Sequence, residues 1–197
     1  MIKKQFSKFS IALIFSLILF TCTEISAQSL KINPKTFSMT IYGTTNVHNF
    51  DSKVTQVSGE LVMTNSKQVQ SFVVEIPVKS IKSNEKLMDT KTYESFNAEK
   101  NPKITFRSTD VNSLTVNGSD INVSVTGNMT IAGVTRKVTL ITSGKIVKPG
   151  VYEFKGSIAL KMTDYKMSPP TAMLGMMKVG DAITLKYDVT FEGGPVN

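Results

Sequence analysis

Residues 121–131, INVSVTGNMTI, place an apolar side chain or a glycine at every second position. Asn, Ser and Thr occupy the positions between them. This period of two is typical of a β-strand with one face toward a core and the other toward water. The chain then reverses tightly at Ala132-Gly133-Val134 and continues into a second such segment. The two segments together predict an antiparallel hairpin, and they indicate an all-β fold.

The same alternation recurs along the rest of the chain, most clearly in residues 151–162 and 182–192. Asn117-Gly118 and Pro149-Gly150 are turn signals between neighbouring strands, and Asn65-Ser66 is a third. We predict eight strands, near residues 35–48, 54–64, 68–80, 102–111, 119–132, 135–147, 151–162 and 182–192. Short connections between most of them favour an antiparallel meander, and closure into an eight-stranded β-barrel would leave no exposed edge.

Two segments interrupt the strand pattern. Residues 83–99 favour a short helix, with Ser83 and Asn84 as candidate caps. Residues 163–181 form a long loop with a Pro-Pro pair, and residues 162–177 hold five of the ten Met residues of the chain. Long loops with such a compositional bias are more often functional than merely connective.

The N-terminus has the three parts of a secretory signal. Lys residues precede an apolar run at residues 11–20, and Ile25-Ser26-Ala27 offers small residues for cleavage after Ala27. An alternative is a lipoprotein signal in which Cys22 is acylated, although Phe20 and Thr21 fit that motif poorly. We therefore expect residues 1–27 to be a signal peptide, residues 28–197 to be one domain, and the protein to be periplasmic or secreted.

Composition excludes several classes of function. The 197-residue chain contains one Cys, one His and no Trp, which is too few ligands for a zinc site built from Cys and His. Its formal charge of +8 comes almost wholly from scattered Lys residues, with Arg107 and Arg136 the only Arg. Because no basic run is interleaved with aromatic residues, we expect a solvated lysine surface and no nucleic-acid partner, with weak attraction to anionic lipid still open.

The sequence contains no recognisable catalytic constellation. His48 has no clustered Cys or carboxylate partner, so the first interpretation is a histidine satisfied near a strand end, and contact with a ligand headgroup is the second. Glu85 and Asp89 resemble a solvated helix face, while Asp164 and Asp181 resemble turn or cap residues. We predict neither an enzyme nor a resident cofactor or metal.

The apolar face of the predicted sheet is the remaining candidate site. An eight-stranded barrel has an interior just wide enough to be filled by side chains or to hold one elongated ligand, and alternation alone leaves both open. Flexible Met residues favour an adaptable binding surface. Candidate ligand contacts on this face are Met39, Ile41, Phe72, Val74, Ile76, Phe106, Phe154, Ile158, Leu185 and Tyr187.

Three ordered motifs resemble a known family. The stretch GNMTIAGVTRKVTL at 127–140 closely resembles the signature hairpin of YceI-like proteins, and NPKITF at 101–106 is similar to the strand that follows the helical insertion in that family. Gly43-Thr44, with His48 and Phe50, resembles its first-strand motif. Lys137 and Met129 depart from the usual Pro and Leu, and the loop at 164–177 is longer and richer in Met than in the simplest members.

The resemblance implies a lipocalin-like eight-stranded antiparallel barrel with a helical insertion, exported from the cytoplasm, that holds a polyisoprenoid or similar long amphiphile such as an isoprenoid quinone. It does not imply an enzyme. The helical segment and the Met-rich loop would then cover a mouth of the barrel, where His48 or a Lys could hydrogen-bond the headgroup. The further candidate contacts there are Leu87, Met88, Phe96, Met162, Met173 and Met176.

Two other interpretations stay open at this stage. A packed barrel would act as an extracytoplasmic interaction or stress-associated module, with the Met-rich loop as a protein contact or a homodimer interface. A hydrolase or isomerase would act on a bound lipid through His48. Transient contact with a membrane surface fits the lipid-binding interpretation.

Overall fold

A computed structural model of the protein describes residues 27–65 and 68–194, apart from the side chains of Ala172 and Met173. Residues 1–26 of the predicted signal peptide, Cys22 among them, lie outside the described residues, and so does Ser66 of the predicted turn at Asn65-Ser66.

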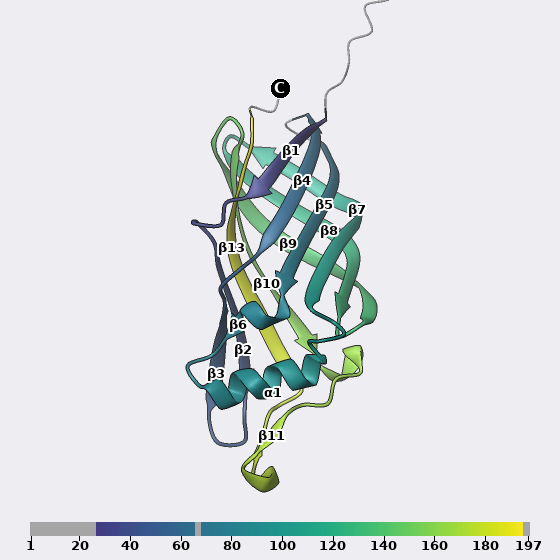
Figure 1. Cartoon of the computed structure of the whole chain (residues 1–197). Helices are drawn as coiled ribbons and strands as arrows, with labels where there is room; N and C mark the ends of the chain where they lie inside the picture. The colour runs from purple at the N-terminus through teal and green to yellow at the C-terminus, as the bar shows by residue number, and fades with distance from the viewer. Residues whose placement is uncertain (1–26, 66–67, 195–197) are drawn as a thin grey trace, which may run out of the picture.

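Long β-strands dominate the structure (Figure 1). The strands of the main sheet are β1 (Gln28–Ile32), β2 (Ser38–Thr44), β3 (Asn49–Val54), β4 (Ser58–Asn65), β5 (Gln68–Pro77), β6 (Ile81–Lys82), β7 (Lys103–Asn117), β8 (Asp120–Ile131), β9 (Val134–Lys148), β10 (Val151–Lys161) and β13 (Ala182–Glu192). A separate two-stranded hairpin consists of β11 (Thr171–Ala172) and β12 (Met177–Lys178). The helical elements are α1 (Lys86–Phe96) and the single turns η1 (Val78–Ser80), η2 (Thr163–Tyr165) and η3 (Met173–Gly175).

The main sheet closes into a barrel. Antiparallel pairing runs from β1 through β4, β5, β7, β8, β9 and β10 to β13, and β13 pairs back onto β1. One edge of β13 pairs with β10. Two strands share its other edge, because β1 pairs with the C-terminal end of β13 and β2 with its middle. Since β1 and β2, β3 and β4, and β5 and β6 are successive halves of bent strands, the barrel has eight strands, which confirms the predicted fold.

The bends between these half-strands have local causes. Between β1 and β2, the Asn33 side-chain oxygen accepts a 2.8 Å hydrogen bond from the backbone N–H of Lys35, forming an Asx turn around Pro34. Between β3 and β4, the backbone N–H and the hydroxyl of Thr55 both donate to the carbonyl of Ser80 at 2.9 Å. These bends were not predicted, and β1 was missed altogether because it offers only five residues of alternation.

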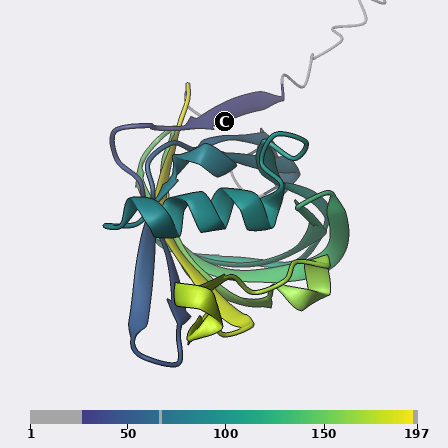
Figure 2. The same cartoon turned by 60° about the horizontal axis from the view of Figure 1, so that its bottom comes forward.

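Helix α1 lies across one end of the barrel (Figure 2). The Asp89 carboxylate accepts a 2.7 Å hydrogen bond from the backbone N–H of Ser83, and the Ser83 hydroxyl accepts one of 3.1 Å from the N–H of Glu85. The helix ends at Asn97, which adopts the left-handed conformation with φ 48°. The predicted helix over 83–99 is therefore confirmed in position, with shorter bounds.

Glycines inside the barrel let aromatic rings lie along its wall. A Cβ atom placed on Gly43, Gly127, Gly144 or Gly156 would come closer than 3.0 Å to the aromatic side chain of a neighbouring strand. The four side chains that cover these glycines are, in order, Phe50, Phe106, Phe154 and Tyr187. Each ring thus occupies the space over a glycine backbone, and does not have to project toward the barrel axis.

We expect Gly43→Ala to destabilise the fold by about 1–3 kcal/mol, because the added methyl group displaces the Phe50 ring. Phe50→Leu in the Gly43→Ala background should recover part of that loss, since the three atoms nearest to the added methyl group all belong to the Phe50 ring. Urea unfolding of the two single variants and the double variant measures the coupling. Strictly additive effects would contradict the proposed packing.

Candidate ligand-binding site

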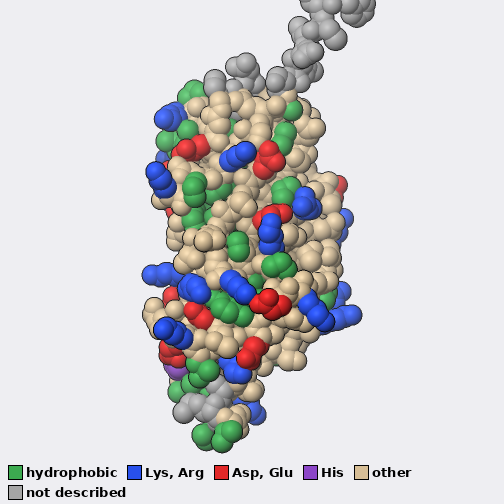
Figure 3. Space-filling view, in the orientation of Figure 1, with side chains coloured by type: hydrophobic (Ala, Val, Ile, Leu, Met, Phe, Trp, Pro, Cys, Tyr) green, Lys and Arg blue, Asp and Glu red, His purple; other side chains and the backbone are tan. Residues whose placement is uncertain are grey.

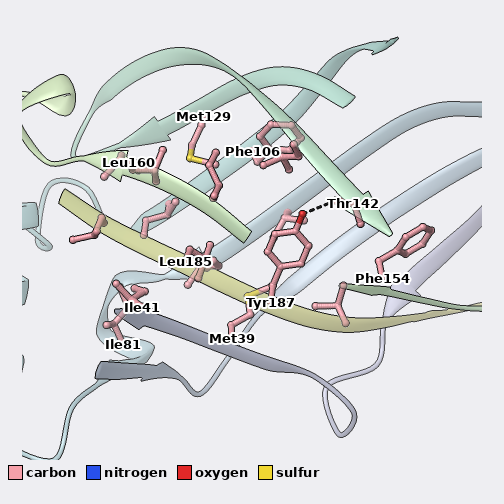
Figure 4. Close-up of a pocket in the computed structure, with 18 of the residues that line it drawn as sticks. Met39, Ile41, Ile81, Phe106, Met129, Thr142, Phe154, Leu160, Leu185 and Tyr187 are labelled. Atoms are coloured by element: carbon pink, nitrogen blue, oxygen red, sulfur yellow. Dashed lines mark hydrogen bonds between the residues drawn. The ribbon is translucent and has the colours of Figure 1, made fainter. Parts of the chain in front are cut away.

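The barrel encloses a cavity of about 200 Å³ along its axis. Its lining reaches from Val116 and Ile121, near the β7–β8 turn, to Met88 of α1 and Pro170 of the Met-rich loop at the other end. Apolar side chains from all the long strands line it. Figure 4 shows those of β2, β7, β8, β10 and β13 around the cavity. The interior is therefore a cavity with an almost wholly apolar wall, which sequence alternation alone could not establish.

Most of the predicted ligand contacts line this cavity. They are Met39, Ile41, Phe72, Val74, Ile76, Met88, Phe96, Phe106, Phe154, Ile158, Met162, Leu185 and Tyr187. Period-two alternation found the strand residues because every second side chain of a barrel strand faces inward. Whether they touch a ligand stays a prediction.

Three predicted contacts lie outside the cavity lining, which corrects their expected position. Leu87 is on the outward side of α1 and is 58% exposed, because Met88 and Phe96 occupy the face that meets the barrel. Met176 is 68% exposed on the β11–β12 hairpin. His48 is exposed in the β2–β3 turn. The side chain of Met173 lies outside the described residues.

His48 contributes to the structure through hydrogen bonds of its backbone. Its carbonyl accepts hydrogen bonds from the N–H of Thr45 at 2.8 Å and from the Thr45 hydroxyl at 2.9 Å, and its own N–H donates to that hydroxyl at 3.0 Å. These contacts fix the tight turn between β2 and β3. The imidazole does not face the cavity, so a headgroup contact or catalysis by His48 has no support in this geometry.

Sequence reasoning missed some lining residues whose signal was present. Val123, Val125 and Met129 lie in the most clearly alternating strand, and their inward direction follows from that pattern. Phe50, Thr92 and Val179 also line the cavity, yet they are brought there only by the bends and by the packing of α1 and the Met-rich loop across the barrel end.

A hydrogen-bonded pair interrupts the apolar lining midway along the barrel. The hydroxyls of Thr142 on β9 and Tyr187 on β13 lie 2.5 Å apart (Figure 4). Burial raises the pKa of Tyr187, and the hydrogen bond from Thr142 partly opposes this rise. Each hydroxyl therefore has the other as a hydrogen-bond partner inside the apolar lining.

Polar groups gather at the end of the cavity covered by α1. Thr92, Ser95 and Lys161 line the cavity there, together with Tyr165 of η2. Among the described side chains, the Tyr165 hydroxyl is the buried polar atom without a hydrogen-bond partner. Burial, and then the charge of Asp164, raise the pKa of Tyr165, while Arg136 lowers it. The cavity is thus apolar along most of its length, with most of its few polar side chains toward α1.

The carboxylates near this end serve the loop structure. Asp181 accepts hydrogen bonds from the backbone N–H of Thr163 at 2.8 Å and from its hydroxyl at 2.7 Å, and these bonds lower the pKa of Asp181. Within residues 27–65 and 68–194, no group of three or more His, Cys, Asp or Glu side chains is placed to hold a metal ion. None of the described helices combines the length and apolar character needed to cross a bilayer.

A closed antiparallel barrel of eight strands around an apolar axial cavity belongs to the class of barrels that can enclose a small or elongated molecule. Within that class, the chain belongs to the YceI-like family, since the model of the YceI-like domain matches residues 24–191. Comparison with curated protein sequences finds no significant match.

Solved structures share the fold. BcnA of Burkholderia cenocepacia is 19% identical, with a TM-score of 0.64, over 81% of this chain and 98% of its own. A polyisoprenoid-binding domain from Saccharophagus degradans, implicated in plant cell wall breakdown, is 10% identical, with a TM-score of 0.66, over 85% and 99%. The YceI protein of Campylobacter jejuni is 20% identical, with a TM-score of 0.57, over 71% and 82%. At these identities the likeness concerns the fold.

We expect Tyr187→Phe to destabilise the protein by about 1–3 kcal/mol, because it leaves the Thr142 hydroxyl unpaired in apolar surroundings. Adding Thr142→Val should cancel much of that loss, since both polar groups are then gone. Urea unfolding of the single and double variants measures this. If the loss of stability in the double variant equals the sum of the losses in the two single variants, the two hydroxyls do not stabilise each other.

We also expect stability to fall as the pH rises above 10. Burial raises the pKa values of Tyr152, Tyr165 and Tyr187 above the ordinary 10.0, so the unfolded chain releases these protons at a lower pH than the folded one. Their contribution to the free energy of unfolding is complete below pH 10 and is lost above it. Urea unfolding at about pH 9 and about pH 11 tests this, and Tyr187→Phe should reduce the fall.

Proposed function

We propose that this protein binds a long-chain amphiphilic lipid, of the polyisoprenoid or isoprenoid quinone type, inside its barrel outside the cytoplasm. It would carry or sequester the lipid without changing it chemically. The observation that carries this proposal is the apolar cavity along the barrel axis, whose polar side chains, apart from the Thr142–Tyr187 pair, gather toward one end. Membership of the YceI-like family and the fold shared with a polyisoprenoid-binding domain support it.

The direction of the bound lipid follows from the distribution of polar groups. The hydrocarbon chain would lie among the inward side chains of β8, β10 and β13, where each square ångström of apolar area removed from water contributes about 25 cal/mol. The polar end would lie beneath α1, near the unpartnered Tyr165 hydroxyl and Lys161. This replaces His48 as the expected headgroup contact.

The proposed location rests on the N-terminal sequence. Its basic start, short apolar run and small residues before Ala27 support export and cleavage, with lipidation of Cys22 as the alternative route to a membrane. After cleavage the chain would contain no Cys, which is compatible with an oxidising compartment.

We expect Leu185→Trp to abolish stabilisation by an added prenyl lipid. Leu185 pairs across the sheet with Ile41 and Ile158, and its side chain points into the cavity, so an indole there takes the place of the lipid chain (Figure 4). The measurement is the melting temperature with and without a solubilised polyprenol, since a ligand that binds only the folded state raises it.

Ile141→Trp is the matched control, because Ile141 lies on β9 outside the cavity and is 76% exposed. It should keep the full stabilisation seen with the original chain. Equal stabilisation of both Trp variants would place lipid binding outside the barrel. No stabilisation of the original chain would favour the interpretation as an interaction module.

A further inference from the structure

Two turns join into a single projection beside the α1 end of the barrel (Figure 1). The Asn46 side chain donates a 2.9 Å hydrogen bond to the carbonyl of Met176 and accepts one of 2.8 Å from the N–H of Lys178. The N–H of Asn46 in turn donates to the carbonyl of Lys178 at 3.1 Å, and the N–H of Gly180 donates to Thr44 at 2.8 Å. The β2–β3 turn and the β11–β12 hairpin are therefore one connected unit.

Large apolar side chains stand in solvent on this unit. Leu174 is 104% exposed, and Val47 and Met176 are each 68% exposed; we call these three residues the apolar tip. In Figure 3, apolar side chains occupy the lowest point of the molecule, where the β11–β12 hairpin projects. Leu174 has a φ of 55°, a conformation that costs energy for a bulky residue. Leu174 thus combines an unfavourable backbone conformation with a fully solvent-exposed apolar side chain.

The charged side chains within the two segments that carry the apolar tip are those of Lys166 and Lys178. Residues 165–180 and the turn at 44–50 contain no Asp or Glu, and Asp51, Asp164 and Asp181 directly flank these two segments. No ion pair involves either of these Lys residues in the described part of the chain. Residues 1–27 hold three of the 23 basic and one of the 15 acidic residues, so the remainder carries +6. Exposed apolar side chains on a domain with a net positive charge complement an anionic lipid surface.

The same segment also forms part of the cavity wall. Pro170 and Val179, which flank the β11–β12 hairpin, both line the cavity, as do Met88 and Thr92 of the adjacent α1. A surface that receives the apolar tip would therefore lie next to the polar end of the cavity.

We infer that the apolar tip docks this protein onto bilayers that contain anionic lipid, with Val47, Leu174 and Met176 entering the interface. Docking itself needs no bound cargo. Its use, to exchange a lipid between bilayer and barrel, rests on the proposed function. A second copy of the chain is the competing occupant, and the test separates the two.

Because the chain contains no Trp, Leu174→Trp places the single Trp of the variant at the tip, and excitation at the red edge of its absorption avoids the five Tyr. On addition of vesicles of phosphatidylglycerol and phosphatidylcholine, its emission should shift to shorter wavelength and be quenched by brominated acyl chains. Ile141→Trp, at a position that is 76% exposed on the barrel wall, should show neither effect. Both variants have the same N-terminal sequence, so any contribution of residues 1–27 to vesicle binding is the same in both.

An unshifted Leu174→Trp spectrum with vesicles, or an equal shift of both variants, would overturn the inference. A shift that grows with protein concentration in the absence of vesicles would overturn it in favour of self-association. As a second measure, Leu174→Asp with Met176→Asp should lower the vesicle partition coefficient about tenfold or more, while Ile141→Asp leaves it unchanged. A protein that docks but yields no lipid on extraction would refute the proposed function and leave the docking intact.

Discussion

The packing of aromatic rings over glycines is the constraint on which the cavity depends. The interior of an eight-stranded barrel is just wide enough to be filled by inward side chains or to hold one small ligand, so the placement of bulky side chains decides which. Here Phe106 and Phe154 lie over Gly127 and Gly144 of neighbouring strands, so their bulk is taken up by the wall. Tyr187 lies over Gly156 in the same way, and that position brings its hydroxyl within 2.5 Å of Thr142. The packing of rings over glycines thus both leaves space along the barrel axis and brings the Tyr187 and Thr142 hydroxyls within hydrogen-bond distance.

The two ends of the barrel are built differently. At the end of β13 near its C-terminus, Phe191 is almost fully buried, and its ring lies 5.7 Å from that of Phe72 and 6.1 Å from that of Phe154. Where β13 begins, α1 and the Met-rich loop cover the barrel with a mixture of apolar and polar side chains. An aromatic cluster thus fills one end, and an amphipathic cover with an unpartnered tyrosine lies over the other. This asymmetry would give a bound amphiphile a single orientation.

Sequence patterns predicted the barrel and much of its lining because a period of two is a property of the strand itself. The inward positions of Met39, Ile158 and Leu185 needed nothing more than alternation. The helix over 86–96 was likewise visible in local composition.

What the sequence did not reveal depends on contacts between distant segments. The pairing of Gly43 with the Phe50 ring, or of Gly156 with Tyr187, requires the register of neighbouring strands. His48 and Met176 were expected at the cavity because a histidine and a Met-rich loop suggest binding. The contacts of Thr45 and Asn46 instead hold them in turns that face solvent. Composition indicated that the Met-rich loop matters, but not which of its side chains face inward.

The most direct measurement is mass spectrometry of a solvent extract from the mature protein, purified without detergent. If the apolar cavity is a lipid site, the extract contains a long-chain isoprenoid or quinone in a stoichiometric amount. The matched extract of Leu185→Trp contains none, while that of Ile141→Trp contains as much as the original chain. An empty extract from the original chain, together with no uptake of added prenyl lipid, would contradict the assignment of the barrel interior as a lipid-binding site.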